Sequence, residues 1–191
     1  IKNMDNDKLI EAMVGRTLEN LYPKEQGVKG KEGLRAEHLM AEGVLHDVSF
    51  TAYHGEILGF AGLVGAGRTE TMRAIFGADP LDGGKVYVEG EEVQIKNPTE
   101  AIAKKIAFLT EDRKGQGLVL SQSVKTNLIM SSMKRFRKNG LFDFKKIEAV
   151  SRENIEKLKI KTPTSEEVVA QLSGGNQQKV VIGKWLNSDS E

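Results

Sequence analysis

The sequence predicts a fold of the α/β class, and three observations support this prediction. Its 191 residues, 39% hydrophobic and 29% charged, match the size and composition of one globular domain with a real core. Strand-like and helix-like patterns alternate along the chain. A glycine-rich loop at residues 62–67 separates an apolar run from a helix-like segment, which is the strand, loop and helix succession from which α/β folds are built.

A helix is expected near the N-terminus, because apolar residues recur at helical spacing from Asp7 to Tyr22. Pro23 ends this pattern, and residues 24–33 are polar and charged like a linker. The first residues are charged and lack an initiator Met, unlike a secretory signal. We therefore interpret the chain as a piece of a longer protein, with a boundary near residue 30.

The next segments predict strands around one helix. Residues 34–39 and 48–53 alternate apolar and polar side chains, whereas Ile57–Ala61 is continuously apolar, as in a central strand. Thr69–Phe76 has one apolar face and predicts a helix. The remaining expected elements are a hairpin turn at Asp82–Gly84, a strand at 85–88, a helix begun by Pro98 and ended by Lys105, a buried strand at Ile106–Leu109, and helices at 124–137, 145–158 and 176–186.

Composition excludes several functional classes. With 28 Lys plus Arg against 27 Asp plus Glu, the near-neutral chain is not expected to bind nucleic acid in bulk. The absence of Cys excludes disulfides, Cys-ligated zinc and thiol catalysis, and the three scattered His form no plausible metal set. Residues 57–67, the most apolar uncharged stretch, are too few to span a bilayer.

The sharpest motif is a phosphate-binding loop, Gly62-Leu63-Val64-Gly65-Ala66-Gly67-Arg68-Thr69. Its glycines let backbone N–H groups turn toward phosphate oxygens, the following helix adds positive potential, and the Thr69 hydroxyl suits Mg²⁺. Arg68 stands where the pattern asks for Lys, and its longer planar fork is not equivalent to a compact ammonium. The alternative is an ordinary glycine-rich turn between a strand and a helix.

A second motif, Leu172-Ser173-Gly174-Gly175-Asn176-Gln177-Gln178, opens the last predicted helix. Its hydroxyl, free N–H groups and positive helix end are what a phosphate presented from outside would need. As an alternative, Ser173 only caps the helix, although this leaves the two glycines unexplained.

These two motifs together resemble the ATPase domain of ABC transporters. Arg68, the segment Glu111–Leu118 and the motif Leu172–Lys179 resemble, more narrowly, the second cassette of tandem ATPases that energise bacterial simple-sugar importers, with ribose-type systems the most similar. The helix containing Met13–Arg16 is similar to the tail of the first cassette. The resemblance implies a P-loop NTPase fold with a RecA-like core, an antiparallel β subdomain and a helical subdomain at about 120–178. It divides the chain into a tail and linker (1–30) and a partial nucleotide-binding domain (31–191).

The resemblance also implies ATP and Mg²⁺ as ligands. Glu111 falls where the family usually has the Q-loop Gln, and with Thr69 it would contact Mg²⁺ through the nucleotide. Catalytic residues of the family come later than Glu191, so none is assigned; an alternative places the Walker B strand at residues 106–112. The residues implied to bind nucleotide are Gly62, Leu63, Val64, Gly65, Ala66, Gly67, Arg68, Thr69, Glu70 and Glu111, and those of the ABC signature are Leu172, Ser173, Gly174, Gly175, Asn176 and Gln177.

The implied partners are a preceding cassette of the same polypeptide, transmembrane permease subunits and, indirectly, an extracytoplasmic sugar-binding protein, with no nucleic acid. The implied location is the cytoplasmic face of the cell membrane. Because Arg68 and Glu111 depart from the family while the signature does not, we expect unequal ATP sites. The alternatives are a non-hydrolysing regulatory module and a soluble ABC protein without membrane partners. The basic run Lys134–Lys138 is either a solvated helix face or a contact for anionic lipid or an acidic protein.

Overall fold

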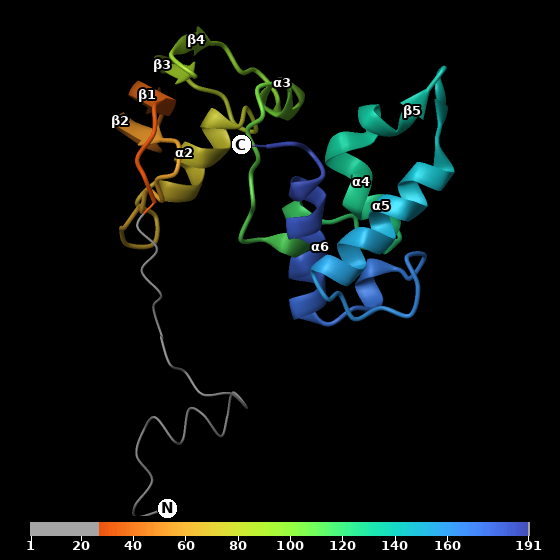
Figure 1. Cartoon of the computed structure of the whole chain (residues 1–191). Helices are drawn as coiled ribbons and strands as arrows, with labels where there is room; N and C mark the ends of the chain where they lie inside the picture. The colour runs from red at the N-terminus through yellow and green to blue at the C-terminus, as the bar shows by residue number, and fades with distance from the viewer. Residues whose placement is uncertain (1–26, 191) are drawn as a thin grey trace, which may run out of the picture.

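The computed structural model describes residues 27–190. The helix predicted at Asp7–Tyr22, including Met13–Arg16, lies outside the described residues. The described chain contains a sheet with two helices beside it and a larger helical part that ends in α6 (Figure 1). No helix in residues 27–190 is long and apolar enough to cross a membrane.

The sheet is antiparallel and has the strand order β2-β1-β3-β4. The register of β1 with its two neighbours is seen at Leu34, which lies opposite Ala52 of β2 on one side and Val88 of β3 on the other. Helix α2, Arg68–Ile75, places Ile75 against the sheet residues Leu39 and Val86, which are all buried. The strands are β1 (Glu32–Ala41), β2 (Leu45–Tyr53), β3 (Gly83–Val88) and β4 (Glu91–Val93).

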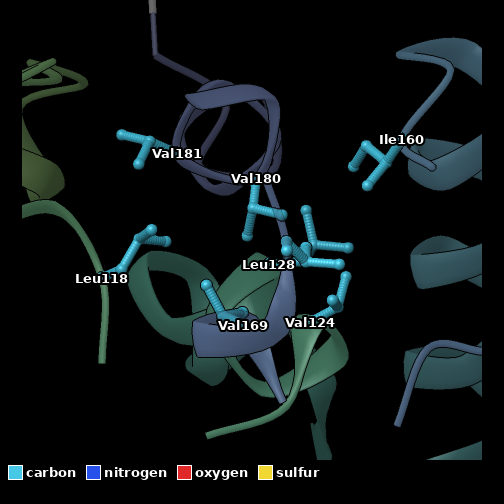
Figure 2. Packing of buried hydrophobic residues seen from close by; sticks show 8 residues of the cluster. Leu118, Val124, Leu128, Ile160, Val169, Val180 and Val181 are labelled. Atoms are coloured by element: carbon cyan, nitrogen blue, oxygen red, sulfur yellow. The ribbon is translucent and has the colours of Figure 1, made fainter. Parts of the chain in front are cut away.

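The helical part has its own apolar core, shown in Figure 2. Val124 and Leu128 of α4, Val169 of the η3 turn and Val180 of α6 are fully or almost fully buried there. The elements of this half of the chain are α3 (Pro98–Ala103), the π-helical turn η1 (Arg113–Gly117), α4 (Val124–Ile129), the 3-10 segment η2 (Met130–Phe136), β5 (Arg137–Lys138), β6 (Leu141–Phe142), α5 (Phe144–Lys157), η3 (Val169–Gln171) and α6 (Gly174–Leu186).

Two predicted strands, Ile57–Ala61 and Ile106–Leu109, are absent from the structure. Neither segment has regular secondary structure, and the Ile57 side chain is fully exposed. A central parallel strand needs hydrogen-bonded neighbours on both sides, and the described residues supply none, since both sheets among them are antiparallel. The expected parallel core is therefore not formed, whereas the antiparallel and helical subdomains are.

Two further expectations were inaccurate. The hairpin turn lies at Glu89-Gly90 between β3 and β4, not at Asp82–Gly84. Glu89 and Gly90 have φ values of 54° and 82°, as the tight turns favoured in hairpins require. The single helix predicted over residues 124–137 is split into α4 and η2, with Ser132 outside helical geometry.

Candidate functional site

The glycine-rich loop has the backbone conformation of a tight turn into α2. Gly65 and Gly67 have φ values of 84° and 78°, a region that side chains other than glycine enter only at a cost. A Cβ atom on Gly67 would also lie 3.2 Å from both the Leu45 side chain and the Val44 carbonyl oxygen. Gly67 is therefore required twice, by its backbone angle and by its neighbours.

The first turn of α2 is left without a capping side chain. Gly67 occupies the N-cap position, and no side chain accepts a hydrogen bond there. The first acceptor inside the helix is the Gly67 carbonyl, which receives the Thr71 N–H at 2.9 Å and the Thr71 hydroxyl at 2.7 Å. The earlier N–H groups of the helix point along its axis toward the loop, where the helix dipole favours an anion. This cradle fits a phosphate group.

Arg68, Thr69 and Glu111 are all exposed. Within residues 27–190 the Arg68 and Glu111 side chains have no hydrogen-bond or ion-pair partner, so both are available to a ligand. The same residues contain no cluster of three or more His, Asp or Glu side chains able to hold a metal. The exposed Thr69 hydroxyl is an oxygen donor of the kind that Mg²⁺ prefers.

The second motif opens α6, and its serine does not cap that helix. Ser173 occupies the N-cap position, but its hydroxyl accepts no backbone hydrogen bond. It accepts instead from the Asn176 side-chain amide at 3.0 Å, and Ser173 remains exposed. The capping alternative is therefore wrong for this geometry, and the hydroxyl and the first N–H groups of α6 face outward together.

The two glycines of this motif have different surroundings. A Cβ atom on Gly174 would lie 2.8 Å from the Arg113 guanidinium, whereas Gly175 has nothing within 4 Å. Arg113 approaches Gly174 because its Nε donates to the Gln177 side-chain oxygen at 3.2 Å. Gln177 is buried and also donates to the Val169 carbonyl at 3.1 Å. Gly174 is thus half-buried beneath the Arg113 side chain, while the space over Gly175 is open to a partner.

A junction of polar groups connects the two motif-bearing helices through η1. Arg73 of α2 donates to the Gln116 side chain at 2.8 Å and holds Asp79 through two hydrogen bonds of 2.6 and 2.7 Å. Lys184 of α6 is buried and donates to the Gly117 carbonyl at 2.7 Å. Burial lowers the pKa of Lys184 below its usual value. The C-terminal end of η1 is therefore contacted by both helices, at Gln116 by α2 and at Gly117 by α6.

An aromatic cluster completes the same junction. Phe76, just past the end of α2, is buried, and its ring centroid lies 5.6 Å from those of Phe108 and Trp185. The junction lies about 12 Å from the start of α2 and about 16 Å from the start of α6, at 1.5 Å per helical residue. The glycine-rich loop and the Ser173-Gly174-Gly175 motif thus lie at the ends of α2 and α6 that are distant from this junction.

The loop residues 62–70 share the start of α2, residues 172–177 share the start of α6, and Glu111 lies between them in sequence, just before η1. Within residues 27–190 no hydrogen bond or ion pair joins the first two groups. Leu172 is buried in the core and serves packing. Sequence reasoning missed Arg73 and Lys184; a lysine in an otherwise apolar stretch of α6 was the signal for the second, and nothing in the sequence marks the first.

The sequence model of the ABC transporter family matches residues 45–191. The chain belongs to this family. The chain also resembles solved ABC cassettes in fold. A nucleotide-free ATP-binding cassette from an ABC transporter matches with a TM-score of 0.63 and 26% identity, over 83% of this chain and 66% of that one. A dimeric cassette in a post-hydrolysis state bound to ADP and Pi matches with a TM-score of 0.66 and 18% identity, over 82% of this chain and 70% of that one.

The similar curated proteins include import ATP-binding proteins. The ribose import ATP-binding protein RbsA of Lactococcus lactis subsp. lactis is 47% identical over 97% of this chain and 37% of its own length. A putative ribose/galactose/methyl galactoside import ATP-binding protein of Agrobacterium fabrum is 48% identical over 94% of this chain and 36% of its own length. This chain therefore spans a little over a third of the length of the curated relatives that it matches.

Proposed function

We propose that this chain is an ATP-binding cassette that energises the import of a monosaccharide, ribose-type favoured, as part of an ABC transporter ATPase. The observation that carries the proposal is the pair of glycine-rich helix starts that have no side-chain capping hydrogen bond, at Gly67 before α2 and at Ser173 before α6. Two such chains in head-to-tail contact would bring the start of α2 of one against the start of α6 of the other. The assignment of a ribose-type sugar as the substrate is supported by the import proteins that share almost half of the residues of this chain.

In this arrangement the uncapped N–H groups of α2 bind the phosphates, and Thr69 and Glu111 orient Mg²⁺ through the nucleotide. Hydrolysis of the terminal phosphate supplies the free energy of transport when ATP is bound. Arg68 neutralises phosphate charge, but its planar fork places donors differently from a lysine. Glu111 adds a negative charge where the family has an amide. Ser173 and Gly175 receive the phosphate of the nucleotide held by the facing cassette.

The two ATP sites of the whole protein are therefore proposed to be unequal. The motif at Ser173 completes a competent site on the preceding cassette, whereas the loop with Arg68 holds nucleotide and turns it over slowly or not at all. The corresponding domain boundaries are a tail and linker at 1–30, the nucleotide-binding domain at 31–191 and a helical subdomain at about 120–178.

Permease subunits are the proposed membrane partners, placing the protein at the cytoplasmic face of the cell membrane. An apolar groove between α3 and η2, lined by Ile102, Met130 and Met133, supports this contact. The groove lies beside the junction that connects η1 to both motif-bearing helices. A movement of these helices on closure of the nucleotide site would therefore change the shape of the groove. An extracytoplasmic sugar-binding protein would act indirectly, through the permease.

Paired substitutions in the whole transporter test this proposal. Ser173→Arg fills the space over the signature with a cation and a long side chain, so we expect ATPase activity and uptake to be largely abolished. Arg68→Ala removes one phosphate contact from the slow site, so we expect a smaller loss of ATPase rate. If Arg68→Ala reduces turnover more than Ser173→Arg, the assignment of the slow site is wrong.

A second candidate function is a regulatory module that binds nucleotide without hydrolysis. The departures at Arg68 and Glu111 favour it, since both lie on the phosphate side of the site. ATPase activity of the whole protein that depends on Ser173 would exclude this candidate. Co-purification with permease subunits would separate both from a soluble ABC protein.

A further inference from the structure

The hairpin between η2 and α5 has an unusual charge. We call residues 134–146 the hairpin tip; they contain β5, β6 and the first turn of α5. Six of the 28 basic residues of the chain lie in the hairpin tip, but only one of the 27 acidic residues, Asp143. The remainder of the chain consequently has four more acidic than basic residues. Positive charge is thus concentrated on one small projection of an otherwise acidic molecule.

The same projection exposes large apolar side chains. Leu141 is 75% exposed, Phe144 72% and Phe142 40%. In the hairpin, Lys138 lies opposite Leu141 and Arg137 opposite Phe142, so each strand pair joins a basic side chain to an apolar one. Figure 1 shows β5 at the end of the helical part that lies away from the four-stranded sheet. The exposed apolar groups are therefore accessible to a broad surface.

Three lysines of the hairpin tip are available for binding. Lys134, Lys138 and Lys145 are exposed and have no ion-pair or side-chain hydrogen-bond partner within residues 27–190. The other three cations are engaged: Arg135 with Asp189, at 2.8 Å, Arg137 with the Gly140 carbonyl, at 3.3 Å, and Lys146 with the Arg135 carbonyl, at 3.1 Å. The Asp143 carboxylate forms no ion pair with these lysines; it accepts the Lys146 backbone N–H at the start of α5.

We propose that the hairpin tip docks onto the anionic headgroups of a lipid bilayer. Lysine ammonium groups on flexible stems reach headgroup phosphates without a fixed geometry. Leucine and phenylalanine beside them enter the boundary between headgroups and acyl chains, as on amphipathic membrane-binding segments. An acidic protein surface would pair with the lysines but leave Leu141 and Phe144 in water. The lipid surface accounts for both features together.

The contact ends within the first turns of α5. Beyond them Glu148 and Glu153 line the same exposed face, and Arg152 is 3.7 Å from the Glu148 carboxylate. These carboxylates would be repelled by an anionic surface. In the proposed contact only the hairpin tip therefore touches the membrane surface, and the rest of α5 leads away from that surface. This inference goes beyond nucleotide binding and permease docking and requires neither.

Vesicle sedimentation of the chain tests the proposal. We expect binding to phosphatidylcholine vesicles that contain phosphatidylserine, weak binding to phosphatidylcholine alone, and loss of binding as salt is raised. Replacing Lys134, Lys138 and Lys145 together by Gln should weaken partitioning about 100-fold, at the contribution usual for lysines near an anionic bilayer. The matched control replaces three other exposed lysines, Lys96, Lys104 and Lys157, by Gln and should bind like the parent chain.

A second measurement separates lipid insertion from a purely ionic contact. A Phe144→Trp variant carrying Trp185→Phe has a single tryptophan, in the hairpin tip, and should show a blue-shifted emission with anionic vesicles and quenching by brominated acyl chains. The proposal is overturned if the control variant loses as much binding as the hairpin variant, or if the emission of this single-tryptophan variant does not move. Binding to polyglutamate with none to vesicles would overturn it in favour of an acidic protein. Self-association abolished by Leu141→Ser, without vesicle binding, would overturn it in favour of a second copy.

Discussion

The aromatic junction between α2 and α6 should contribute strongly to stability. Phe76 is only 6% exposed, and its ring contacts both Phe108 and Trp185. Phe76→Ala removes the whole ring from a site where three segments meet. Truncation of a buried phenylalanine costs about 3–5 kcal/mol of unfolding free energy, which includes the cavity that is left. We expect about 4 kcal/mol here.

The matched control is Phe142→Ala. Phe142 is 40% exposed, and its nearest aromatic centroid, that of Phe144, is 6.5 Å away. Much of its apolar surface is already in water, so its truncation should cost about 1 kcal/mol or less. The two substitutions delete the same atoms, and their difference therefore measures the packing at the junction.

Urea unfolding followed by circular dichroism and by Trp185 fluorescence measures both variants. With a slope of about 2 kcal/mol per molar urea, Phe76→Ala should lower the midpoint by about 2 M. Trp185 is the only tryptophan of the chain, so its emission in the native state reports on this junction and should shift to longer wavelength. An equal loss in both variants, or an unchanged Trp185 emission in Phe76→Ala, would refute the proposed packing.

Two further predictions concern charges at the same junction. Burial lowers the pKa of Lys184 from its ordinary value of 10.5, so between the folded and ordinary values the unfolded chain binds more protons and stability rises with pH. Wild type should therefore gain stability relative to Lys184→Met as the pH is raised toward that ordinary value, and chemical denaturation showing a pH-independent difference would contradict this. The hydrogen-bonded Arg73 lowers the pKa of Asp79 from 3.8, so the charged carboxylate stabilises the fold above that value and its contribution is lost as the pH falls through the folded pKa. Asp79→Asn should cost about 0.5–1 kcal/mol of unfolding free energy at neutral pH, a small value because the ion pair is exposed to solvent. Thermal melts should show that this cost vanishes in acid.

Local patterns were sufficient to predict much of the fold. Alternation located β1 and β2, and amphipathic spacing located α5 and α6 to within two residues. Ile57–Ala61 could not be predicted in the same way, because its apolar run specifies a strand only if neighbouring strands lie on both sides. The break between α4 and η2 at residues 129–130 also depends on tertiary packing, which helical periodicity does not contain.

The site was predictable where backbone geometry requires particular residues. Positive φ at Gly65 and Gly67 and a serine at the start of α6 have direct sequence signals. The connection between the motifs has none, because Arg73 and Gln116 meet across 43 residues. Such pairs follow from how helices pack, so the sequence indicates that charged residues are present but not which of them contact one another.

The measurement that most directly tests the account is a titration of this chain with a fluorescent ATP analogue, with and without Mg²⁺, beside the Arg68→Lys variant. The account predicts saturable binding that unlabelled ATP competes away, strengthened by Mg²⁺, in both proteins. Circular dichroism of each sample confirms that the protein is folded. Absence of binding by both folded proteins would contradict the phosphate-binding role of the loop before α2, and binding by Arg68→Lys alone would contradict the proposal that the native loop holds nucleotide.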